Sequence, residues 1–138
     1  MSQAATRNVN QARAVLLENG DETVVLGFNE TSYRMHLIVL KRLGREEGKR
    51  VKGVIRATAR RIDRIGTGGK YVEPVYGPPR RVAGRIVALD AEANTVTVDA
   101  GMPMVMKVGA PTQRATDFAV GDFVTMNVMP GATFAPAV

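Results

Sequence analysis

Short strand-like segments separated by turn residues dominate the chain. Apolar and β-branched residues alternate with polar ones or form short runs, and Gly, Pro, Asn or Asp stand between these segments. Hardly any segment has helical periodicity. The pattern predicts an all-β protein, with strands at residues 13–17, 23–28, 33–40, 49–58, 81–89, 95–99, 104–108 and 121–128.

The longest predicted strand begins near residue 49, in the middle of the chain. Its small and apolar residues alternate with polar ones, so four cations are expected on one face: Arg50, Lys52, Arg56 and Arg60. Two geometries stay open further along. The strand either continues or gives way to a helical turn that stacks Arg60 on Arg64. Both geometries gather guanidinium groups.

The second half of the chain repeats the pattern of the first. A constant offset brings Leu17 onto Leu89, Thr23 onto Thr95 and Val24 onto Val96. Each half suits a small OB-like or SH3-like barrel. We therefore predict two tandem units from a duplication, either as separate barrels or around one shared core. The predicted parts are a flexible arm (1–11), a first unit (12–64), a Gly/Pro-rich linker (65–80), a second unit (81–129) and a flexible tail (130–138).

The net charge of +6 is concentrated in the middle of the chain. Residues 41–85 hold 14 basic and four acidic residues, whereas the remainder holds five and nine. This asymmetry favours contact with nucleic acid or an acidic protein surface, although a solubilising face has the same composition. Cations that can neutralise phosphates, and tyrosines that can stack on bases, are the candidate contacts. They are Arg50, Lys52, Arg56, Arg60, Arg61, Arg64, Lys70, Tyr71, Arg80 and Arg81, with Tyr76 as a second stacking residue.

No constellation of residues indicates catalysis. The chain has no cysteine, and His36 is its single histidine, which argues against thiol chemistry, zinc sites and a histidine-based triad. The carboxylates are scattered through turns without an acid–base pair. A Gly-Thr-Gly-Gly run at 66–69 lacks the Lys-Ser/Thr of a phosphate-binding loop. We predict a protein without enzymatic activity and without a cofactor.

Three short motifs follow one another in the second half: Gly84-Arg-Ile, Met102-Pro-Met-Val-Met and Gly121-Asp-Phe-Val. In this order they resemble the small OB-fold copper(I) chaperones of bacterial metal efflux. The resemblance implies an OB-like barrel and puts Met104 and Met106 where that family has two Cu(I)-binding methionines. The chain departs from the family at Met102, where the family has Trp, and it lacks a histidine in the preceding strand. We interpret the methionines as core residues and favour no metal site.

Three functions stay open. The first is non-catalytic binding of nucleic acid through its phosphate backbone, with little sequence specificity. The second is a structural role in a homo-oligomer, filament, virion or larger complex, through the arms and β edges. The third is Cu(I) carriage through the methionine strand. With no apolar run of membrane-spanning length and no signal peptide, we expect no membrane contact and a cytoplasmic location, or one within a particle assembled there.

Overall fold

The computed structural model describes residues 9–66 and 68–137. Within this part the chain is all-β, as predicted, and its 11 strands join in one mixed sheet. A single 3-10 turn, η1 (Ala115–Asp117), is the helical element of these residues. The strands are β1 (Gln11–Asn19), β2 (Thr23–Gly27), β3 (Arg34–Ile38), β4 (Arg50–Arg64), β5 (Tyr71–Glu73), β6 (Tyr76–Gly77), β7 (Arg81–Asp90), β8 (Thr95–Asp99), β9 (Pro103–Val108), β10 (Phe123–Val128) and β11 (Thr133–Pro136). Among the described residues, no helix is long and apolar enough to cross a membrane.

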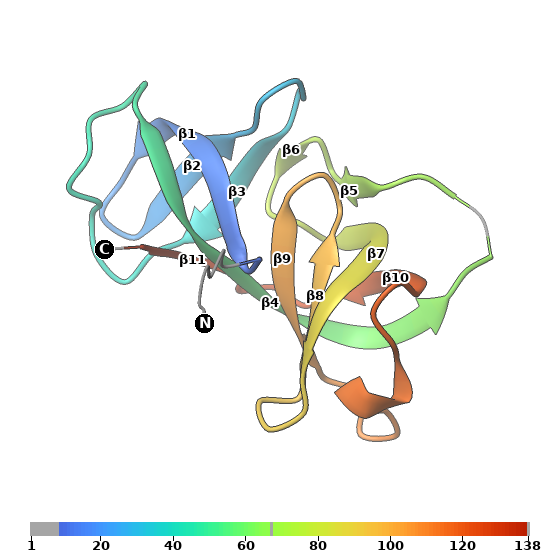
Figure 1. Cartoon of the computed structure of the whole chain (residues 1–138). Helices are drawn as coiled ribbons and strands as arrows, with labels where there is room; N and C mark the ends of the chain where they lie inside the picture. Colours follow the sequence, from blue (N-terminus) through green and yellow to red (C-terminus); the bar gives the residue numbers. More distant parts are fainter. Residues whose placement is uncertain (1–8, 67, 138) are drawn as a thin grey trace, which may run out of the picture.

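Strand β4 belongs to two closed rings of strands. Its first half pairs with β1 on one edge and β11 on the other, and β1, β2, β3, β11 and β4 close the first ring. Its second half pairs with β9 and β10, and β4, β10, β7, β8 and β9 close the second ring. Figure 1 shows β4 running from one ring into the other. Between Gly53 and Ala59, partner strands lie along both edges of β4, so a ligand can reach this part of the strand only on its outward face.

β4 is extended over its whole length, which decides against a helical turn in its second half. Its small and apolar residues, such as Ile55 and Ala59, are buried, while its cations are exposed. The ladder with β10 shifts register so that Arg60 and Arg61 together face Asn127. This bulge keeps both arginines exposed and returns the next residue to the core.

The inward-facing side chains of both rings form one continuous cluster of buried residues. Burial of this aliphatic and methionine-rich surface is the main force that holds the sheet together. The buried residues of the two rings therefore belong to one cluster in the described part of the chain.

The two rings repeat the same ladder positions. Leu16 pairs with Leu26 just before a bulge in β1, and Ile86 pairs with Val98 just before a bulge in β7. Leu26 of β2 and Val98 of β8 occupy equivalent positions in these two ladders, as the constant offset places them. In β1 and β7 the match is displaced, since Leu16 corresponds to Ile86 and not to Ala88 as the constant offset predicts. The difference arises because β7 and β8 make three cross-strand pairs beyond the bulge, whereas β1 and β2 make two.

The C-terminal segment is not a free tail, contrary to the predicted flexible arm at 130–138. Its strand β11 lies between β3 and β4, and Ala132 and Phe134 are buried. Gly53 allows β11 to approach β4, because a Cβ at this position would lie 2.2 Å from the carbonyl oxygen of Ala135. The prediction failed because a four-residue strand with one large apolar side chain has too weak a pattern to be recognised.

The predicted linker at 65–80 also contributes to the sheet. Here β5 pairs with β7 and β6 pairs with β3. The hydroxyl of Tyr33 accepts a hydrogen bond of 2.9 Å from the backbone N–H of Val72, which ties the segment to the first ring. Of the predicted arm at 1–11, residues 1–8 lie outside the described residues, and Gln11 begins β1.

Candidate nucleic-acid interface

Four cations lie in line on the outward face of β4, and we call them the basic row: Arg50, Lys52, Arg56 and Arg60. All four are exposed. At about 3.3 Å per residue, the row extends over about 33 Å. Within residues 9–66 and 68–137, none of these four side chains makes a hydrogen bond or an ion pair. Their charged groups are therefore free to meet a partner.

Other predicted contact residues are held by neighbouring side chains. Arg61 pairs with Asp63 at 2.9 Å, and Lys70 pairs with Asp99 at 3.0 Å. Arg80 is exposed, but it precedes β7, which does not pair with β4. The structure thus divides the predicted cations into a free row on β4 and a set that is paired or lies elsewhere.

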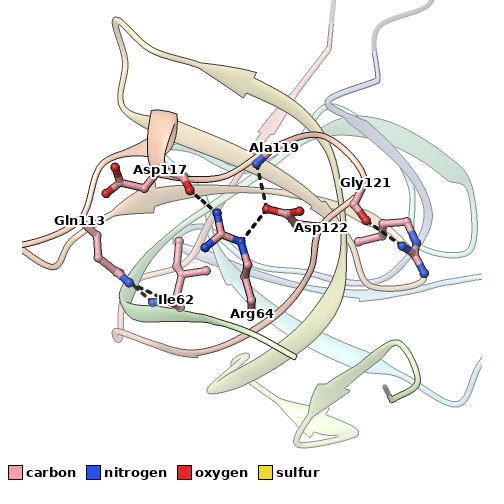
Figure 2. Close-up of polar contacts among 8 residues, drawn as sticks. Ile62, Arg64, Gln113, Asp117, Ala119, Gly121 and Asp122 are labelled. Carbon is pink, nitrogen blue, oxygen red and sulfur yellow. Dashed lines mark hydrogen bonds and ion pairs between the residues drawn. The ribbon is translucent and has the colours of Figure 1, made fainter. Parts of the chain in front are cut away.

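Arg64 is fixed at the end of β4 (Figure 2). Its Nε donates to the carboxylate of Asp122 at 3.0 Å, a second guanidinium nitrogen donates to the carbonyl of Asp117, and the group lies 5.0 Å from the ring centroid of Phe118. The N–H of Ala119 donates to the same carboxylate at 2.9 Å. This N–H, and then Arg64, hold the pKa of Asp122 below its ordinary 3.8. Arg64 therefore anchors the strand and is not part of the free row.

A side-chain amide completes the edge of β4 near the same end. Gln113 accepts a hydrogen bond of 2.9 Å from the N–H of Ile62 and donates one of 2.7 Å to its carbonyl, as Figure 2 shows. These two bonds replace the ladder that β9 would make if it were longer. The backbone of β4 is thus satisfied here by a side chain from 51 residues away.

The two tyrosines do not join the basic row. The hydroxyl of Tyr71 accepts a hydrogen bond of 3.0 Å from Arg81, which lowers the pKa of Tyr71 below its ordinary 10.0. Tyr76 is exposed, and its ring lies edge-on to His36 with centroids 5.0 Å apart. Their strands, β5 and β6, pair with β7 and β3. The outward face of β4 therefore offers charge but no aromatic surface for base stacking.

Three cations that the sequence did not single out lie beside the basic row. Arg13 of β1 stands directly opposite Lys52, and Lys107 of β9 lies in the ladder with the second half of β4. Arg45 donates two hydrogen bonds, of 3.2 and 2.8 Å, to the carbonyl of Arg50. The alternation of β1 shows that Arg13 faces outward, but only the strand pairing shows which residue it faces.

A hollow of about 370 Å³ opens beside the start of β4. We call it the cationic hollow, because half of its lining residues are cations. It is lined by Arg13, Ala14, Val15, Asn29, Arg45, Arg50, Val51 and Lys52.

The methionines that resemble copper ligands lie in the core. Met104 and Met106 are both 0% exposed, and Met102 is 3% exposed. They face inward among aliphatic side chains of the single buried cluster. Their surroundings are those of packing residues that fill an irregular core. In the described part of the chain, no group of three or more His, Cys, Asp or Glu side chains is placed to hold a metal ion.

Comparison of the chain with protein-family models, with curated proteins and with solved structures finds no match. The resemblance of the second half to copper(I) chaperones stays a prediction. The functional argument therefore depends on the geometry and charge of the molecule.

Proposed function

We propose that the chain is a non-catalytic nucleic-acid-binding protein that contacts the phosphate backbone through the basic row. The observation that carries the proposal is the line of four exposed cations on the outward face of β4, which have no side-chain partner among the described residues. Lysine and arginine side chains that neutralise phosphates release counterions, and this release supplies most of the affinity of sequence-independent binding. Most hydrogen bonds between proteins and DNA go to phosphate and sugar, and the row has no aromatic side chain on which a base could stack, which favours backbone contact.

The proposal extends to the fold: we interpret the two rings as OB-like units that arose by duplication and share β4. The repeated ladder positions and the bulges in β1 and β7 support this interpretation. OB-like barrels commonly bind single strands. A single-stranded nucleic acid is therefore the favoured ligand.

Salt dependence of oligonucleotide binding tests the proposal. Four contacts to a single strand should give a slope of log K against log salt of about −3, at about −0.7 per neutralised phosphate. Substituting both Arg56→Gln and Arg60→Gln should bring the slope to about −1.4, since two contacts remain. Charge reversal by Arg56→Glu with Arg60→Glu should abolish binding. Fluorescence anisotropy with a labelled single strand, at several salt concentrations, measures the affinity of the wild type and of both double variants.

A matched control separates local contact from general attraction. Arg34→Glu with Arg114→Glu makes the same change of charge at exposed arginines outside β4. These variants should keep most of the affinity. The proposal is rejected if the wild-type chain does not bind at low salt, or if the control loses as much affinity as the charge-reversed row.

A second candidate function is that of a subunit in a homo-oligomer. An apolar groove of about 370 Å³ lies between residues 38–44 and β11, and Leu40 beside it is 104% exposed. In the described residues, β11 pairs with β3 only at Thr133, so most of that edge of β11 carries no ladder. A strand from a second copy can pair along such an edge. Sedimentation should then show an oligomer that Leu40→Ser weakens, and a monomer at high concentration would exclude this role.

An acidic protein surface would use the same basic row as nucleic acid, and competition between oligonucleotides and an acidic polypeptide distinguishes the two partners. No observation favours Cu(I) carriage, because the methionines concerned are core residues.

A further inference from the structure

Like charges face each other at the cationic hollow. Arg13 of β1 stands directly opposite Lys52 of β4, and both side chains are exposed. The Cβ atoms of such a cross-strand pair lie about 5 Å apart, and like charges in these positions destabilise a sheet. The arrangement therefore lowers the stability of the free protein. An anion bound between the cations would remove this cost.

Arg45 is already oriented at the same place. Its Nε and one Nη atom donate to the carbonyl of Arg50, which holds the guanidinium against the start of β4. The remaining N–H groups of this guanidinium have no partner in the described part of the chain. A donor held in place loses less conformational freedom when a ligand arrives. The guanidinium of Arg45 is thus held in a position from which its remaining N–H groups can donate to a ligand with several acceptor oxygens.

The remaining lining residues of the hollow strengthen this preference. Ala14, Val15, Val51 and Asn29 are uncharged, and among the described residues no carboxylate lines the hollow. Arginine pairs with phosphate through parallel hydrogen bonds, and lysine adds a point charge. A single carboxylate would neutralise one of the four cations, whereas a phosphate group carries more charge and more acceptor oxygens.

We infer that the cationic hollow is a phosphate-binding site in which Arg13 and Arg45 act together with Arg50 and Lys52. Two sources supply this chemistry: a terminal phosphate of a nucleic-acid strand that lies along the basic row, or a free polyphosphate. In the first case the inference rests on the proposed function and names the end of the bound strand. In the second case the phosphate site does not depend on the proposed nucleic-acid binding.

Pyrophosphate binding to the full-length chain in a low-salt chloride buffer tests the inference. We expect one saturable site by calorimetry, at least tenfold weaker in Arg13→Gln and in Arg45→Gln. The free Arg13→Gln variant should melt at a higher temperature than the wild type, because the substitution removes the like-charge pair with Lys52. Pyrophosphate should raise the melting temperature of the wild type but not that of the variants.

Arg34→Gln and Arg114→Gln serve as matched controls, since these exposed arginines lie outside the hollow. They should bind pyrophosphate like the wild type. The inference is overturned if the wild type does not bind pyrophosphate or if the Arg13→Gln and Arg45→Gln variants keep wild-type affinity. It is also overturned if the controls lose as much affinity for pyrophosphate as these two variants. An Arg13→Gln variant that melts lower than the wild type and binds equally well also overturns it.

Two oligonucleotides, with and without a 5′-phosphate, separate the two sources and the two proposals. Preference for the phosphorylated strand, lost in Arg13→Gln, assigns the hollow to the strand end. Equal binding of both strands, with pyrophosphate still bound at the hollow, assigns the hollow to free polyphosphate. The variant with Arg56→Gln and Arg60→Gln should keep its pyrophosphate site. If no oligonucleotide binds but pyrophosphate does, the proposed function fails while the hollow stands.

Discussion

The carboxylate of Asp122 shows how a single residue holds the end of a long strand. It accepts hydrogen bonds from the N–H of Ala119 and from Arg64, so the segment before β10 is tied to the last residue of β4. These two donors stabilise the ionised form, and they hold the pKa of Asp122 below its ordinary 3.8. Folding therefore favours the charged carboxylate.

A pH-dependent stability follows from this pKa. Because the folded pKa lies below the unfolded value, the contribution is complete above the unfolded pKa and is lost as the pH falls through the folded pKa. Asp122→Asn should lower the melting temperature at pH 7, and its difference from the wild type should shrink as the pH falls below the ordinary pKa of 3.8. Thermal melts across this range measure the effect. Asp21→Asn is the control, since the Asp21 side chain is 87% exposed and 3.8 Å from its partner. A difference that stays constant with pH would contradict the assignment.

At the residue scale, the sequence predicts what depends on local alternation. The period of two in β4 correctly places Arg50, Lys52, Arg56 and Arg60 outward, since neighbouring residues decide that pattern. It does not show that Arg64 is anchored, because its partner lies 58 residues away. Pairing between distant segments is therefore the step that separates the free cations from the held ones.

At the scale of elements, β11 is a strand that the pattern of apolar and polar residues does not predict. Its four residues include one large apolar side chain, Phe134, and nothing in the local sequence says where that side chain packs. In the structure it closes the first ring beside β4, where Gly53 leaves room for it. The strand exists because of its tertiary partner more than its own propensity.

The importance of β11 can be measured. Phe134→Ala should destabilise the protein by about 3–5 kcal/mol, because it empties a buried aromatic site. Gly53→Ala should also destabilise it, by about 1–3 kcal/mol, since the new methyl group collides with β11. Urea denaturation measures both. Ala135→Ser, at an exposed position of the same strand, should change little, and a wild-type midpoint for Phe134→Ala would show that β11 is dispensable.

At the scale of the whole molecule, the two rings cannot be separated without dividing a strand. They share β4, and one buried cluster runs through both. Shared elements of this kind couple the free energies of the parts. The chain should therefore unfold in one transition, although the sequence suggests two tandem units.

Hydrogen exchange tests this coupling. Val24→Ala in β2 and Val98→Ala in β8 each remove methyl groups from a fully buried side chain, one in each ring. Each substitution should lower the protection of the most stable amides in both rings by the same free energy. Loss of protection confined to the substituted ring would show that the rings open independently.

The first ring also has a consequence for synthesis of the protein. Four of its strands are complete once Arg64 has been added, but its fifth, β11, is made of Thr133–Pro136 near the other end of the chain. A ribosome adds about 5–20 residues per second. The other four strands of the first ring are therefore synthesised several seconds before β11, the strand that lies between β3 and β4. Nascent chains should stay sensitive to proteases and accessible to chaperones until Phe134 has emerged from the ribosome. The first ring then closes when β11 pairs with β3 and β4.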